Sequence, residues 1–211
     1  MTSYAVTGGP SRSFPASDAF LAGAAATGDV LVVLSGGSVP ADSTHAAVLV
    51  ELHHGSLGEH TGETNGEEGS NVLGFARWRN GDDPPSALVE LVVQKNTKPE
   101  AIGAARAVFE AAGLTIAVCT DQPGRILDRL LRPKYNAALR FLDEGLATQP
   151  DMDLTCKLGL GYPDGPIERL LRGGLHHHHE ASAALFEAFG TPGYAPARRS
   201  VVAARRKADD A

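Results

Sequence analysis

Histidine is concentrated in one run of the chain, His176-His177-His178-His179-Glu180. On a helix, His176 would share a face with His179 and with Glu180, and these spacings suit a divalent metal ion. No second pair of residues with metal-ligand spacing follows the run, and residues 181–189 continue as an ordinary amphipathic helix. We therefore favour a solvated helix start, without a metal, over a metal cluster.

Three further groups of polar side chains could take part in binding or in acid–base chemistry. Arg77-Trp78-Arg79 could bracket an adenine or a CoA phosphate, although a strand-edge tryptophan between solvated arginines accounts for the same residues. The tail 198–207 is basic, but the solvent face of a helix explains it better. His53, His54 and His60 could supply a base, yet no spacing supports that role. We favour the structural interpretation of all three groups.

A dinucleotide-binding domain opens with a strand, a G-x-G-x-x-G turn and a helix, and this sequence has no such turn. Gly8-Gly9-Pro10 follows an apolar stretch but has the wrong spacing. Pro10 also removes an amide donor that would face a pyrophosphate. Gly36-Gly37 is followed by Ser38-Val39-Pro40 rather than by a helix. We interpret both glycine pairs as ordinary turns and expect no cofactor, so that neither NAD nor NADH binds.

The elements that would position these side chains change in kind near residue 120. Before it, apolar stretches typical of buried strands alternate with helical patterns, which predicts an α/β layer with a largely parallel sheet. The predicted strands cover residues 29–34, 46–52, 88–93 and 114–119, and the predicted helices cover residues 17–26 and 99–112. Residues 53–70 are polar and glycine-rich, which predicts a mobile loop.

After residue 120 the pattern is helical. Asp121 is a good N-cap before Gln122-Pro123, and leucines recur at helical spacing as far as Leu146. Pro133 predicts a bend in this long helix, and Pro150 predicts its end. Further helical patterns follow, so the second part of the chain is predicted to be all-α.

Composition bounds the class of protein. The chain has 211 residues, of which 43% are hydrophobic, and this suits a compact fold with its own core. No run of about 18 apolar residues and no signal-type start is found, so we expect a cytoplasmic protein without membrane contact. The two cysteines, Cys119 and Cys156, lack metal-type spacing and suit a reducing compartment. A net charge of −6 argues against nucleic acid as a partner.

The stretch from Asp121 to Pro166 carries an ordered set of short motifs. They are Asp121, Pro123 and Gly124; Asp128-Arg129-Leu130-Leu131; Glu144-Gly145; Asp153; and Gly159-Leu160-Gly161-Tyr162-Pro163-Asp164-Gly165-Pro166, with Gly174-Leu175 and Tyr194-Ala195-Pro196 further on. In this order they resemble the C-terminal domain of the L-3-hydroxyacyl-CoA dehydrogenase family. The resemblance implies a reduced Rossmann-like α/β domain over residues 1–120. Over residues 121–211 it implies an all-α domain like the C-terminal domain of 6-phosphogluconate dehydrogenase.

The short first domain is similar to part of the tandem bacterial members of this family. In those proteins a complete dehydrogenase is followed by a reduced Rossmann domain and a second helical domain. The sequence resembles that second half.

The resemblance also implies where a catalytic site would lie. In active members a histidine removes the proton of the 3-hydroxyl group while hydride passes to the nicotinamide, and a glutamate orients that histidine. Ala76 stands at the position of the histidine, whereas Glu90 keeps the catalytic glutamate. A catalytic-site asparagine of the family becomes Asp128, which accepts hydrogen bonds without donating any when ionised, and a substrate-contacting serine falls at Gly55. The remaining substrate-binding candidates are Arg77 and Asn80.

These changes predict a protein of CoA-thioester (fatty or aromatic acid) degradation that has lost the dehydrogenase reaction. It would bind an acyl-CoA or pair with a complete dehydrogenase. Two alternatives remain open. The first is an active NAD-dependent 3-hydroxyacyl-CoA dehydrogenase, or a related CoA-thioester enzyme, with a rearranged site. The second is a dimerisation module without a ligand.

In the resembled family the helical domain forms the subunit interface. This implies that residues 122–196 mediate a dimer, with a second copy or with the helical domain of a complete dehydrogenase. Apolar side chains in excess of what a small core needs support the same expectation. They are Leu127, Leu131, Leu139, Leu142, Leu170, Leu171, Leu185, Phe186 and Phe189.

Overall fold

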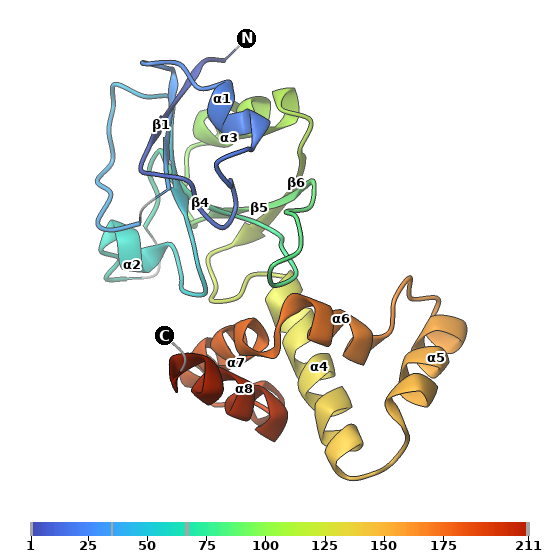
Figure 1. Cartoon of the computed structure of the whole chain (residues 1–211). Coiled ribbons are helices and arrows are strands. Elements are labelled where there is room, and N and C mark those ends of the chain that lie inside the picture. The colour runs from blue at the N-terminus through green and yellow to red at the C-terminus, as the bar shows by residue number, and fades with distance from the viewer. Residues whose placement is uncertain (1, 35, 66–67, 210–211) are drawn as a thin grey trace. The chain divides into compact units, whose positions relative to one another are not determined.

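The computed structural model describes residues 2–34, 36–65 and 68–209. An α/β part is followed by a helical part (Figure 1), so the predicted order of fold classes is confirmed. By their contacts, residues 1–79 and 85–125 form an α/β unit, and residues 80–84 and 126–211 form a helical unit. The division therefore follows Arg125 instead of the expected residue 120, and the short segment 80–84 belongs to the helical unit.

The α/β unit is built on a six-stranded sheet whose strands lie in sequence order. Neighbouring strands are parallel except β4 and β5, which are antiparallel. The strands are β1 (Tyr4–Thr7), β2 (Val30–Val33), β3 (Ala47–Glu51), β4 (Val72–Arg77), β5 (Leu88–Val93) and β6 (Thr115–Thr120). The central strand β3 is buried along its whole length, as expected of an apolar strand that is covered on both faces.

Helix α3 (Pro99–Ala111) packs against one face of this sheet and lies close to its predicted bounds. It begins at Pro99, where the missing N–H removes a donor that would have no partner within the helix. The buried side of α3 presents Phe109 to an aromatic cluster that it forms with Phe14, Phe20 and Phe75. These rings fill the main core of the unit.

The helix predicted over residues 17–26 is a single turn, α1 (Ala19–Ala22). Asp18 caps it, because the Asp18 carboxylate accepts a 2.9 Å hydrogen bond from the N–H of Phe20. Gly23 then ends the turn. The predicted helix is therefore too long at both ends.

Asp121 does not start the helix that the sequence predicts at this position. Its carboxylate instead accepts hydrogen bonds from the N–H groups of Leu57 at 2.6 Å and Gly58 at 2.8 Å. Asp121 thus holds the first turn of α2 (Gly58–Thr61), inside the segment 53–70 that was expected to be a loop. Residues 66 and 67 of that segment lie outside the described residues. Since the capping group is 63 residues away from Gly58, no local pattern reveals this helix.

The helical unit contains five α-helices and one 3-10 helix among the residues that the structure describes. They are α4 (Leu127–Asp143), α5 (Gln149–Leu160), α6 (Pro166–Gly173), α7 (Leu175–Phe189), η1 (Pro192–Tyr194) and α8 (Arg198–Asp209). Tyr135, Leu139 and Ile167 lie at the centre of its core. None of the helices in the described part of the chain combines the length and the apolar character needed to cross a membrane.

The connection between α5 and α6 shows why a glycine is needed in one of the motifs. The Asp153 carboxylate accepts hydrogen bonds from the N–H groups of Ile167 at 2.8 Å and Glu168 at 3.1 Å, and it thereby caps α6. A Cβ atom at Gly165 would lie 2.2 Å from the Cβ of Asp153. Only glycine allows the two segments to approach this closely.

A buried polar network joins α4 and α7. The ring of His178, which is 1% exposed, places Nε2 2.9 Å from Asn136 Oδ1 and Nδ1 3.3 Å from Arg132 Nη1. Because arginine can only donate, Nδ1 accepts, and the neutral ring carries its proton on Nε2. Asn136 Nδ2 then donates to the backbone oxygens of Gly193 and Tyr194. The expectation that the whole histidine run is a solvated helix start is therefore wrong at His178.

This burial makes the stability of the protein depend on pH. Burial lowers the pKa of His178 from its ordinary 6.5 to about 3, and the charge of Arg132 adds to the shift. Stability is full above pH 6.5 and falls as the pH drops from 6.5 toward 3, because in that window the unfolded chain binds the proton and the folded chain does not. His178→Gln, which can keep both hydrogen bonds, should remove roughly 1.4 kcal/mol per pH unit from this acid loss of stability.

Urea unfolding near neutral pH and about two pH units lower measures the difference. His179→Gln, one position along α7, is the matched control and should behave as the wild type. The interpretation fails if the free energy of unfolding of His178→Gln falls with pH as steeply as that of the wild type.

Candidate functional site around Glu90

Glu90 lies in the middle of β5, directly across from Ala76 on the antiparallel strand β4. Ala117 of β6 flanks Glu90 on the other side in the same register. Residues paired in this way point to the same face of a sheet, so the three side chains share one face. Ala76 brings only a methyl group, which has no basic atom, to the face that carries Glu90.

Glu90 forms a buried ion pair with Arg125. Arg125 Nε lies 3.4 Å from Glu90 Oε2, and each side chain is only 5% exposed. Arg125 Nη2 also donates a 2.8 Å hydrogen bond to the backbone oxygen of His53. Arg125 has a φ of 50°, a left-handed conformation that costs a residue with a Cβ about 1–2 kcal/mol. Sequence analysis assigned no role to Arg125, because a single arginine after Gly124 matches no chemical motif.

The thiol of Cys119 lies on the same face, since Cys119 pairs with Val92, two residues from Glu90. Burial raises the pKa of Cys119 to about 11, and the negative charge of Glu90 adds to the shift. The thiol is therefore protonated near neutral pH, when it is a poor nucleophile. Both cysteines of the chain are free.

Arg77 lies on the opposite face of the sheet from Ala76, because consecutive strand residues point to opposite sides. Its guanidinium forms an ion pair with Asp18 and donates to the backbone oxygens of Ser86 and Ser13. These contacts hold the segment after β1 against the end of β4. The structure does not bring Arg77 to Glu90.

Asn80 and Asp128 belong to the helical unit. Asn80 Nδ2 donates to Asp83 Oδ2 at 3.0 Å and to the backbone oxygen of Arg169 at 3.1 Å, which holds the segment 80–84 against α6. Asp128 is buried, and its Oδ1 accepts hydrogen bonds from Nε and Nη2 of Arg132 at 2.9 and 2.7 Å. Both predicted site residues are thus engaged by partners within their own unit.

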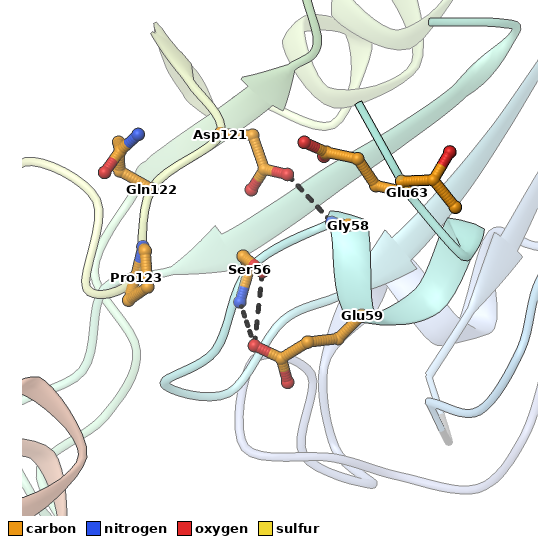
Figure 2. Close-up of a pocket in the computed structure, with 8 residues that line it drawn as sticks. Ser56, Gly58, Glu59, Glu63, Asp121, Gln122 and Pro123 are labelled. Carbon is orange, nitrogen blue, oxygen red and sulfur yellow. Dashed lines mark hydrogen bonds between the residues drawn. The ribbon is translucent and has the colours of Figure 1, made fainter. Parts of the chain in front are cut away.

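A cleft of about 460 Å³ opens beside α2 in the α/β unit (Figure 2). It is lined by Ser56, Gly58, Glu59, Glu63, Thr64, Asp121, Gln122 and Pro123. Its three carboxylates disfavour the phosphates of a nucleotide or of CoA. Figure 2 shows that Glu59 turns toward Ser56, whose N–H donates to Glu59 Oε1 at 2.8 Å. A Cβ at Gly55 would lie 2.5 Å from the same oxygen, so a serine at this position would require Glu59 to move.

The dinucleotide cofactor implied by the resemblance does not fit the start of this sheet. A pyrophosphate binds at the N-terminus of a helix that directly follows the first strand. After β1 the chain turns through Gly8, with a φ of 91°, and the next described helix, α1, begins only at Ala19 and has four residues. The described residues after β1 therefore do not present the required group of amides.

Comparisons with known proteins agree with the helical unit. The profile of the 3-hydroxyacyl-CoA dehydrogenase C-terminal domain matches residues 124–210. Human mitochondrial hydroxyacyl-coenzyme A dehydrogenase is 37% identical over 87 residues, which cover 41% of this chain and 28% of that protein. L-carnitine dehydrogenase from Pseudomonas syringae is 41% identical over 75 residues, which cover 35% of this chain and 24% of that protein.

Solved structures share the fold over most of the chain. (S)-3-hydroxybutyryl-CoA dehydrogenase from Ralstonia eutropha superposes with a TM-score of 0.70 at 20% identity, over 85% of this chain and 66% of that chain. FadB2 from M. tuberculosis gives a TM-score of 0.71 at 21% identity over the same shares of the two chains. Residues 124–210, which make up most of the helical unit, thus match the C-terminal domain of the 3-hydroxyacyl-CoA dehydrogenases, and the chain resembles part of such a protein. It spans only 28% of the length of the first curated relatives that it matches.

The buried ion pair gives a direct test of the site. Arg125→Met leaves the Glu90 carboxylate buried beside an apolar side chain, so we expect the free energy of unfolding to fall by about 3–5 kcal/mol. Adding Glu90→Gln removes the uncompensated charge and should recover at least about 1 kcal/mol. Urea unfolding measures both values. Arg106→Met, which breaks the exposed pair with Glu110, is the control and should cost less than about 1 kcal/mol. Losses that simply add in the double variant would contradict the pairing.

Proposed function

We propose that this protein is a non-catalytic relative of the 3-hydroxyacyl-CoA dehydrogenases. It acts by associating with a complete dehydrogenase of CoA-thioester (fatty or aromatic acid) degradation. The observation that carries the proposal is the position of Ala76 directly across from Glu90, with Arg125 paired to the glutamate.

The chemistry of the site supports the loss of the reaction. Dehydrogenation of a 3-hydroxyacyl-CoA needs a group that takes the hydroxyl proton as hydride leaves the same carbon. Ala76 has no basic atom, and the guanidinium of Arg125 stays protonated and cannot accept a proton. The Cys119 thiol is protonated as well. Loss of a positioned base typically costs roughly 10²–10⁴ in rate.

Exposed apolar side chains on the helical unit support a role in association. Leu154 and Leu158 lie one turn apart on α5, and both are exposed, Leu158 to 79%. Leu160 at the end of the same helix is exposed too. An apolar helix face of this kind is typical of a protein interface.

Some of the apolar side chains that were expected to exceed the needs of the core belong to the core itself. Leu139, Leu170 and Leu185 are buried in the helical unit's own core, whereas Leu171 and Phe186 are exposed. We therefore centre the proposed interface, within residues 122–196, on α5. An acyl-CoA is the candidate small ligand of this companion, and the acidic cleft beside α2 is not suited to its phosphates.

The first test of the proposal is turnover. With 3-hydroxybutyryl-CoA and NAD, the purified protein should form NADH no faster than buffer, because Ala76 brings no base to Glu90. Ala76→His should stay inactive, since the described residues after β1 do not form a helix start whose backbone N–H groups could bind the pyrophosphate. A complete dehydrogenase is the positive control, and absorbance at the NADH band is the readout. NADH formation by the unmodified protein would refute the proposal and favour an active NAD-dependent enzyme with a rearranged site.

The second test is association. Light scattering at micromolar concentration should give the mass of a dimer, alone or mixed with a complete dehydrogenase. Leu154→Glu with Leu158→Glu should shift the mass toward the monomer, because two carboxylates would enter an apolar contact. Val202→Glu, at a partly exposed position on α8, is the matched control. A monomeric mass for the unmodified protein under both conditions would rule out the association.

A further inference from the structure

Three side chains that bind metal ions in other proteins converge within the helical unit. They are Asp82, from the segment 80–84, and His176 and His177, from the first turn of α7. One ligand atom of each lies within 4.8 Å of those of the others. Asp82 Oδ1 is 3.0 Å from Nε2 of His177, and the two imidazole centroids are 4.0 Å apart. Asp82 and His177 are 95 residues apart in sequence, so the fold creates this cluster.

The surroundings of His177 suit a metal ligand. Its Nδ1 lies 3.4 Å from Glu180 Oε2, while Nε2 faces Asp82. A histidine that binds a metal typically donates its other ring N–H to a carboxylate, which fixes the tautomer and the ring orientation. Glu180 is placed to be that carboxylate. Nε2 would then present its lone pair to a metal ion in place of its hydrogen bond to Asp82.

A cation already occupies the other histidine. Lys207 Nζ lies 2.7 Å from His176 Nε2, and an ammonium group can only donate, so the imidazole nitrogen accepts. The lone pair of His176 Nε2 thus accepts from a side chain on the surface rather than from the buried core. A metal ion at this nitrogen would displace the flexible lysine side chain.

We propose that Asp82, His176 and His177 form a binding site for a divalent late first-row transition-metal ion. Two imidazole nitrogens and one carboxylate oxygen are ligands that Zn²⁺ prefers, with water at the remaining position. Ligand distances of about 2.0–2.2 Å require the three atoms to close by a small movement, which the 72% exposed side chain of Asp82 can make. The ion would join the segment 80–84 to α7 and stabilise the helical unit by mass action. The site does not depend on the proposed function.

The dependence on Asp82 distinguishes this site from metal capture by a flexible histidine run. A run would use any of its histidines and would ignore Asp82. In the structure His178 turns into the buried network, and His179 contributes no ligand atom to the cluster. The site therefore requires Asp82 and is indifferent to His179.

The experiment titrates the untagged, EDTA-treated protein with Zn²⁺ in competition with a chromophoric chelator. Asp82→Ala should weaken Zn²⁺ binding by at least roughly tenfold, the loss that even an outer partner of a metal ligand typically causes. His179→Ala is the matched control and should bind as the wild type. Lys207→Met should bind several-fold more tightly, because the competing ammonium is gone. Zn²⁺ should raise the melting temperature of the wild type and not that of Asp82→Ala, and without metal the two should melt alike.

Three outcomes would overturn the site. They are unchanged Zn²⁺ affinity in Asp82→Ala, an equal loss of affinity in His179→Ala, and no Zn²⁺ binding by the unmodified protein at micromolar concentration. The first would assign any binding to the histidine run alone, and the second would show that the ligands are not the three proposed.

Discussion

A carboxylate buried in a sheet needs a cation or several hydrogen-bond donors beside it, and Glu90 imposes this constraint on the α/β unit. Arg125, the last residue of that unit, supplies this cation. It does so in a left-handed backbone conformation that surrounding contacts must hold. The N–H of Gly124 donates to the backbone oxygen of His54 at 3.2 Å at the same place. The ion pair thereby fixes the chain that leaves β6 alongside the segment that follows β3.

Two aspartates of the family-like motifs have structural roles that do not need catalysis. Asp121 accepts hydrogen bonds from the first amides of α2, and Asp153 accepts them from the first amides of α6. The close approach of Asp153 to the start of α6 also requires Gly165. Each carboxylate satisfies N–H groups that a helix start leaves without intrahelical partners. Motifs of this kind specify the fold, and so they identify the family more firmly than they identify an activity.

Sequence patterns predicted the elements whose signals are local and missed those that depend on distant partners. Helix α3 follows from Pro99 and an amphipathic pattern, but α2 depends on Asp121, far along the chain. The buried His178 and the pairing of Arg125 with Glu90 likewise join residues remote in sequence. The family resemblance located Ala76 and Glu90, while their direct opposition depends on strand register, which periodicity alone does not give.

The two units offer different means of recognition. In the α/β unit the guanidinium of Arg125 is paired with Glu90, so the pair presents no net charge to a phosphate. The cleft beside α2 adds three carboxylates. The surroundings of Glu90 are therefore suited to holding strands and loops in place. In the helical unit, Asn136 and His178 hydrogen-bond to each other within the buried core, while the leucines of α5 are exposed. Because apolar surface favours protein partners over phosphates, we centre the proposed association on the exposed leucines of α5.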